Sequence, residues 1–390
     1  MPFNPRSLFA RGFRPFFVGA VLIAIVGMSQ WMAAYLFQWP IPLIGISVFQ
    51  WHAHEMIFGY SMAVIAGFLL TAAQNWTGEK TASGVTLAGL VLLWAVARIL
   101  MLNGTSFLLL AAGVDMLFML GLLFTVARPI LKVRLKRQAP VLLIVAALMI
   151  ANLVFYLGAS GKFANGAWLG VYSGLYLILG MVLFMGRRVI PFFTERGLEP
   201  PVKLANARWN DIATYILYPL FLISELAAPY AWPGAALAGL LVILNSFRVS
   251  GWHTLAIWQK PLIWGLFTAF MMINLGFLLR GLMPVTAIPT YLHIHAFALG
   301  GIGIVTISMM ARVTLGHTGR SVHNAPPIMG MLLVGMSLST LFRLFFPLLD
   351  PTHYSWWVAI AGALWIASFG LFALTFFPML IAPRADGKPG

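Results

Sequence analysis

Two short stretches of the sequence each place two histidines two residues apart, at the start of a long apolar run. The pairs are His52 with His54 and His293 with His295. Successive helix positions turn by about 100°, so the two side chains of a pair project to opposite sides and can hold two different groups. Neutral imidazole is the usual axial ligand of haem iron and also binds copper, zinc and non-haem iron. The four histidines are therefore candidate haem or metal ligands; the alternative is that they face lipid headgroups.

Carboxylates accompany these histidines within the apolar runs. Glu55 directly follows His54 and could orient a ligand, bind a metal or relay protons, or it could be a plain interfacial carboxylate. Glu225 lies toward the outer end of another apolar run. Asp115 lies near the middle of a third, where it marks a proton path or pairs with Arg98 on the adjoining helix.

A second group of candidates is basic and lies at the opposite ends of the predicted helices. Arg14, Arg312 and Arg320 lie beside glycine-rich backbone and could bind an anion such as a haem propionate, a phosphate or a lipid headgroup. The alternative is that they are membrane anchors and helix caps. His317 lies between two of these arginines and is a further candidate metal ligand.

The composition decides which kind of element positions these residues. The chain is 61% hydrophobic and 8% charged, with a mean hydropathy of +0.93, whereas soluble domains have about 25% charged residues. It is therefore predicted to be an all-α polytopic membrane protein. The absence of cysteine excludes disulfides, iron–sulfur clusters and thiolate-ligated or covalently attached haem. The first apolar run is predicted to be a retained helix, because no small-residue cleavage site follows it.

Apolar runs of bilayer length predict twelve membrane helices in one integral domain, residues 1–390. The longest loop, residues 187–211, divides the helices six and six. Three groups of four helices would make helices 2, 6 and 10 equivalent, and helix 6 then offers Tyr172 and Tyr176 at the depth of the histidines. The predicted spans are 15–37, 50–74, 83–101, 106–127, 140–159, 166–186, 212–229, 232–248, 261–282, 289–311, 327–347 and 355–379.

The net charge of +15 follows this topology and does not indicate a nucleic-acid partner. All but four of the 24 lysines and arginines fall on the side of the N-terminus; the exceptions are Arg98, Lys162, Arg280 and Arg343. The positive-inside rule therefore predicts that both termini are cytoplasmic and that the histidine pairs lie at the outer ends of helices 2 and 10.

Four motifs together resemble one family. They are GFRPFF at Gly12–Phe17, WHAHEMIFG at Trp51–Gly59, GFLL with NWTG within Gly67–Gly78, and RVTLGHTGR at Arg312–Arg320. On the basis of these motifs, the chain is identified as a member of the NnrS family. The resemblance implies a twelve-helix protein of the bacterial inner membrane that contains haem and copper. It also implies a role in nitric oxide metabolism, denitrification and resistance to nitrosative stress.

The histidine pairs are also similar to those of haem-copper oxidase catalytic subunits. Carried over by position, this similarity implies that His52 and His295 clamp one haem and that His293 binds a second. The haems would be of the non-covalent b type.

The oxidases' copper needs a histidine on helix 6 and a pair on helix 7. Here Tyr172, four residues before Tyr176, stands at the helix-6 position, and helix 7 has no histidine. An oxidase-type copper centre is therefore not expected. The candidates for a second metal are then His54, Glu55, Tyr172 and Glu225.

Two functions follow as expectations. The first is a membrane oxidoreductase that binds or reduces nitric oxide, with electrons from quinol. Its candidate catalytic residues are Glu55, Glu225, Tyr172 and Tyr176. The second is a non-enzymatic haem and copper protein that scavenges, senses or transports nitric oxide or iron–nitrosyl species. A plain solute transporter is disfavoured, because it has no need of paired histidines at matched depth. Membrane lipid is the other expected partner.

Overall fold

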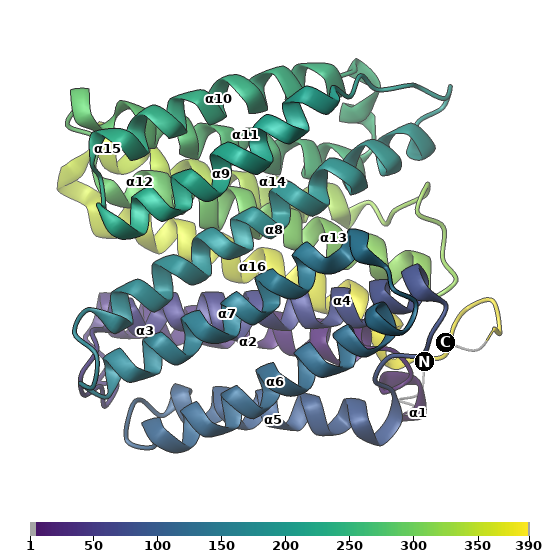
Figure 1. The fold of residues 1–390 in the computed structure, drawn as a ribbon, viewed down its shortest axis with the longest axis horizontal. Coiled ribbons are helices and arrows are strands. Elements are labelled where there is room, and N and C mark those ends of the chain that lie inside the picture. The colour runs from purple at the N-terminus through teal and green to yellow at the C-terminus, as the bar shows by residue number, and fades with distance from the viewer. Residues whose placement is uncertain (1–4, 389–390) are drawn as a thin grey trace. The chain divides into compact units, whose positions relative to one another are not determined.

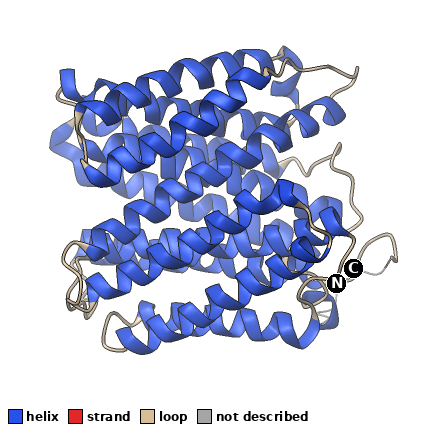
Figure 2. Ribbon diagram, viewed as in Figure 1, coloured by secondary structure: helices blue, strands red, loops and turns tan. Residues whose placement is uncertain are grey.

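The computed structural model describes residues 5–388, and within this range the chain forms helices and no strand (Figure 1, Figure 2). This confirms the predicted all-α class. A helix satisfies its own backbone hydrogen bonds within one segment, which an apolar surrounding requires.

The helices divide into two compact units. The first comprises residues 5–177, 310–321 and 369–388, and the second comprises residues 178–309 and 322–368. The single integral domain and the three groups of four helices stay predictions. Three helices contribute to both units: α8 (Gly166–Gly197), α13 (Ile304–His317) and α16 (Tyr354–Ile381).

The first unit contains the first histidine pair. Besides its parts of the three shared helices, it consists of α1 (Pro5–Leu8), α2 (Phe13–Phe37), α3 (Val48–His54), a π-helical segment (Glu55–Ser61), α4 (Met62–Thr77), α5 (Gly84–Leu102), α6 (Leu108–Lys132), a 3-10 turn (Lys136–Gln138) and α7 (Ala139–Ala159).

The second unit contains the second histidine pair. Besides its parts of the shared helices, it consists of α9 (Arg208–Ala227), α10 (Trp232–Trp252), α11 (Pro261–Leu282), α12 (Thr290–His295), a π-helical segment (Ala296–Gly303), α14 (Ile328–Leu344) and α15 (Phe346–Leu349), with 3-10 turns at Leu255–Gln259, Met283–Val285 and Pro351–His353.

Eleven helices of the described chain are long and apolar enough to cross a membrane. Each of the twelve predicted spans corresponds to a helix, and α9 is the one that does not reach this standard. It carries Asn210, Asp211, Pro219 and Glu225 within 20 residues, and these lower its hydropathy. The count of twelve spans and the orientation of the termini stay predictions.

The prediction of a long loop over residues 187–211 is wrong in its first half. Helix α8 continues through Pro191 and ends at Gly197, and the stretch without helix is residues 198–207. The arginines of this stretch lie on the helix, where Arg188 covers the ring of Phe184 and Arg196 that of Phe192. Stacking of this kind lets an arginine stay on a helix beside apolar residues.

Candidate functional site

Both histidine pairs end a short α-helix that continues directly into a π-helical segment. Helix α3 ends at His54 before the π segment Glu55–Ser61, and α12 ends at His295 before the π segment Ala296–Gly303. The start of α3 is set by a capping box, in which Ser47 and Gln50 each bond the other's backbone N–H. Segments of π-helix are rare and are frequent at functional sites, so the two pairs share a backbone feature that the sequence did not predict.

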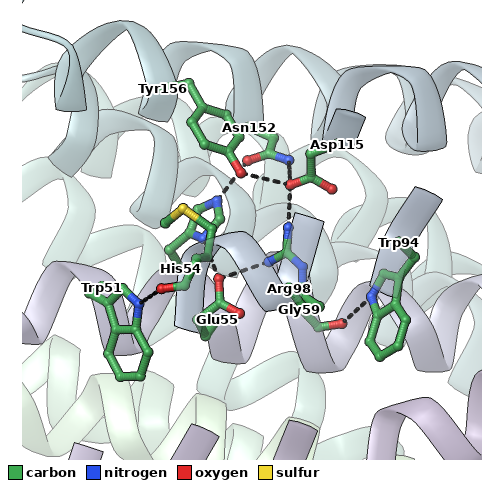
Figure 3. Close-up of polar contacts among 10 residues, drawn as sticks. Trp51, His54, Glu55, Gly59, Trp94, Arg98, Asp115, Asn152 and Tyr156 are labelled. Carbon is green, nitrogen blue, oxygen red and sulfur yellow. Dashed lines mark hydrogen bonds and ion pairs between the residues drawn. The ribbon is translucent and has the colours of Figure 1, made fainter. Parts of the chain in front are cut away.

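Buried polar side chains from α3 and its π segment, α5, α6 and α7 surround the second histidine of the first pair (Figure 3). Each is almost fully buried within the first unit. The group, here called the His54 cluster, consists of His54, Glu55, Arg98, Asp115, Asn152 and Tyr156.

Arg98 lies between the two carboxylates of the His54 cluster. Its Nη1 donates to Oε1 of Glu55 at 2.8 Å, and its Nη2 donates to Oδ2 of Asp115 at 2.5 Å. The sequence-based pairing of Asp115 with Arg98 is thereby confirmed. Asn152 Nδ2 and the Tyr156 hydroxyl donate to the same Asp115 oxygen at 2.9 and 3.1 Å. One buried cation thus faces two carboxylates, which leaves one negative charge to be compensated.

The contacts of His54 show how that charge is compensated. Its Nε2 lies 3.0 Å from Oδ1 of Asn152, and its Nδ1 lies 2.9 Å from Oε1 of Glu55. Because Oδ1 only accepts, Nε2 carries a proton, and a second proton must lie between Nδ1 and Glu55. If the Asn152 amide is turned over, Asp115 must carry that proton instead. In each arrangement one extra proton is present on His54 or on a carboxylate. Together with the positive charge of Arg98, this proton balances the two carboxylates, so the His54 cluster is neutral overall.

Both ring nitrogens of His54 are therefore engaged in hydrogen bonds, which gives no support to its predicted role as a metal ligand. Among residues 5–388 no group of three or more His, Cys, Asp or Glu side chains could hold a metal ion. The predicted second metal, with ligands among His54, Glu55, Tyr172 and Glu225, gains no support either. Tyr172 stacks on Trp168 at 4.7 Å between ring centroids, and Tyr176 is buried 6.4 Å from Tyr172.

His52 faces a different surrounding from His54, as the two-residue spacing predicts. Its ring stacks on Trp31 of α2, with the centroids 4.5 Å apart and the planes at 28°. It is half-buried, whereas His54 is fully buried. The first pair thus places one imidazole in a polar cluster and the other against an aromatic ring.

His293 is fully buried in the second unit, and neither of its ring nitrogens makes a hydrogen bond. The backbone of Thr290 lies close to the ring but without hydrogen-bond geometry. The rings of Tyr230 and Phe297 lie edge-on to it, at 6.2 and 6.0 Å between centroids. A buried polar group without a partner costs about 1–3 kcal/mol, so a histidine left in this state indicates a site for a ligand.

Glu225 forms a buried ion pair that the sequence analysis did not anticipate. Arg280 Nε donates to both carboxylate oxygens at 2.9 and 3.0 Å, and its Nη2 lies 2.7 Å from Oε1. Nη2 also donates to the carbonyl of Ala231 at 2.9 Å, while Nη1 is buried without a partner. The guanidinium acts electrostatically on His293. The signal in the sequence was an arginine within an apolar run, which requires a carboxylate partner.

His295 is held through its own helix. Its Nδ1 lies 2.8 Å from the carbonyl oxygen of Tyr291, and since a carbonyl only accepts, the proton must be on Nδ1. Histidines that ligate a metal are commonly held in this way, with Nε2 as the ligand atom. The geometry is therefore compatible with the predicted role of His295.

The structure brings some of the predicted basic residues together. Arg14 and His317 lie in the first unit and share the neighbours Arg11 and Arg384, and Arg320 acts electrostatically on Arg14. Arg312 is buried in α13. The binding of a haem propionate by Arg14, Arg312 and Arg320 stays a prediction.

Comparison with known proteins gives one family. The chain matches the family described as NnrS protein over residues 7–384, nearly its whole length. No curated protein matches the chain.

Proposed function

We propose a function for this chain, which belongs to the NnrS protein family. In this proposal it is a haem protein of the bacterial inner membrane that binds nitric oxide. Its role is in resistance to nitrosative stress and in denitrification. Family membership indicates a membrane protein related to nitric oxide. The haem, its ligands and the reaction belong to the proposal, which is supported by the side chains described above.

The observation that carries the proposal is the state of His293. An axial ligand must offer iron a nitrogen lone pair that no hydrogen bond uses, and both nitrogens of His293 are buried without a partner. The side chain therefore fits the role of an iron ligand. A b-type haem held there would supply an iron that binds nitric oxide in the reduced state.

The surrounding side chains have separate tasks in this proposal. Tyr230 and Phe297 present ring edges to His293 and exclude water from it. The Glu225–Arg280 pair places a fixed dipole nearby, and Arg280 Nη1 remains as a buried donor for a polar atom of the ligand. The proposed pairing of His52 with His295 joins residues of different units and rests on the family resemblance, as does the presence of copper.

One observation favours binding without turnover, the non-enzymatic alternative. Reduction of nitric oxide consumes protons, and Glu225 was one of the carboxylates that could supply a proton or a ligand for iron. Both of its oxygens accept hydrogen bonds from Arg280, so the carboxylate already serves as the acceptor of a charge-assisted pair. The second candidate function is therefore scavenging, sensing or transport of nitric oxide or an iron–nitrosyl species.

The test uses purified full-length protein in three forms: wild type, His293→Ala and, as control, His353→Ala, whose side chain is exposed. Haem and copper are counted per chain, and nitric oxide is added to the reduced protein while the visible spectrum is recorded. We expect a nitrosyl spectrum in wild type and control that is lost in His293→Ala, with little or no oxygen consumption. An unchanged nitrosyl spectrum in His293→Ala would refute the assignment. Steady consumption of nitric oxide with a quinol donor would show that the protein is an oxidoreductase and does not only bind nitric oxide.

A further inference from the structure

The two ends of the described chain meet in the first unit at one buried arginine (Figure 1). Arg14, in the first turn of α2, is fully buried, and its Nη1 donates to the carbonyls of Leu380 at 2.8 Å and Ala382 at 2.6 Å. Its Nε and Nη2 are buried and have no acceptor. The side chain thus fastens the end of α16 to α2, and two of its nitrogens, with three N–H bonds between them, have no acceptor.

Three further arginines lie around Arg14. Coulombic repulsion from Arg320, Arg384 and Arg11 acts on its guanidinium, and all three are partly buried. Burial, and then the charge of Arg384, lowers the pKa of Arg11 below its ordinary value. We call these four residues the arginine cluster. Like charges that repel one another in partly buried surroundings cost free energy unless an anion lies among them.

The protein offers this cluster little negative charge of its own. Within residues 5–388, one carboxylate with a place in the cluster is that of Asp386, which accepts two hydrogen bonds from Arg384 at 2.8 and 2.6 Å. These bonds hold the pKa of Asp386 well below its ordinary value, so the residue is ionised at neutral pH. Among the described residues, Arg11, Arg14 and Arg384 alone exceed this one aspartate by two positive charges (3 − 1).

His317 does not offset the charge. Its Nδ1 lies 3.4 Å from Nη1 of Arg11, and because a guanidinium only donates, Nδ1 must be the acceptor and the ring neutral. Its backbone carbonyl accepts a hydrogen bond from Nη1 of Arg384 at 3.1 Å. His317 therefore serves to hold Arg11 and Arg384 in place. With Nδ1 used in this way, the structure gives no support to its predicted role as a metal ligand.

A glycine allows the two chain segments of the cluster to approach each other. Gly319 has a φ of +75°, and a Cβ there would lie 2.7 Å from Cγ of Asp386. The neighbouring carbonyl of Thr318 accepts hydrogen bonds from Ala385 N–H at 2.9 Å and Arg320 Nη1 at 3.3 Å. The left-handed turn is thus required to bring Arg320 beside the segment that carries Arg384.

We propose that the arginine cluster is a binding site for a phosphate-type oxyanion, either free phosphate or the phosphate of an anionic lipid headgroup. The forked donors of guanidinium groups match the oxygens of phosphate. The cluster also lies where α2 begins and where the chain continues beyond α16, which is the depth of lipid phosphates for helices that cross a membrane. Phosphate binding here does not require the proposed haem at His293.

The experiment compares wild type with Arg320→Gln and Arg11→Gln, which leave Arg14 and its carbonyl contacts in place. Arg137→Gln is the matched control, because it removes an exposed arginine of the same unit. In neutral detergent, the unfolding temperature is measured with inorganic phosphate and with sodium chloride of equal ionic strength. In nanodiscs, phosphatidylcholine with and without phosphatidylglycerol is compared, and lipid retention is followed by native mass spectrometry.

Wild type and Arg137→Gln should be stabilised by the ligand, and each cluster variant should bind it about tenfold more weakly, since one charge-assisted contact is lost. Stabilisation by inorganic phosphate in detergent identifies free phosphate as the ligand. Retention of phosphatidylglycerol without an effect of phosphate identifies the lipid headgroup. The proposal is overturned if neither probe stabilises wild type, or if Arg137→Gln loses as much binding as the cluster variants.

Discussion

Nδ1 of His54 lies 2.9 Å from Oε1 of Glu55, the next residue in the chain. Neighbouring side chains on an α-helix point about 100° apart and do not normally meet. Here α3 ends at His54 and the π segment begins at Glu55, and both side chains turn toward the same group of helices. The change of helix type thus coincides with the place where a buried imidazole and a buried carboxylate contact each other.

Loss of Arg98 should destabilise the protein more than any exposed substitution. Arg98→Met removes the cation shared by Glu55 and Asp115 and leaves one buried negative charge without compensation, at a cost of about 3–5 kcal/mol. Unfolding in detergent, followed by circular dichroism, measures this. The double variant Arg98→Met/Asp115→Asn should recover part of the loss. A double variant no more stable than the single one would show that charge is not the cause.

His54 should prove structural and not a ligand. In His54→Ala the haem content should stay at the wild-type level while the unfolding temperature falls, because Glu55 and Asn152 lose their shared partner. Haem counting and thermal unfolding on the same preparation separate the two effects. If haem is lost to the same degree as in His293→Ala, the hydrogen-bonded arrangement of His54 is not the functional one.

The Glu225–Arg280 pair requires a glycine in the helix that packs on it. A Cβ at Gly234 would lie 2.1 Å from Oε1 of Glu225, so Gly234→Ala should force the ion pair apart and destabilise the protein by about 1–3 kcal/mol. Gly239→Ala on the same helix is the matched control, because a Cβ there meets no atom within 4 Å. This control should be neutral or stabilised by up to about 1 kcal/mol. Equal behaviour of the two variants in thermal unfolding would contradict the role of Gly234.

Topology can be tested with single cysteines, since the chain has none. Ile44, 74% exposed before α3, and Ser321, exposed after α13, suit this purpose. The positive-inside rule predicts that Ile44→Cys reacts with an impermeant maleimide from the periplasm and Ser321→Cys only from the cytoplasm. Labelling of both positions from one side would show that the predicted orientation is wrong.

The sequence by itself determined the class of the protein and the position of its helices. Apolar runs of bilayer length must be helical, because no other local structure satisfies their backbone, and each of the twelve predicted ranges is a helix. It also determined that His52 and His54 face different surroundings, since this follows from the turn of a helix. The pairing of Arg98 with Asp115 could be predicted from the sequence, because adjoining helices carry opposite charges at the same depth.

Only the tertiary structure decided which side chains meet. The two π segments do not follow from residue spacing, and they change the direction of the side chains next to them. Glu225 and Arg280 are 55 residues apart and contact each other because α9 and α11 place them together. Arg11 and Arg14 lie near Arg384 because the start of α2, the end of α13 and the segment after α16 contact one another. Contacts of this kind depend on helix packing and on the solvation of buried charge, which arise only when the whole chain is folded.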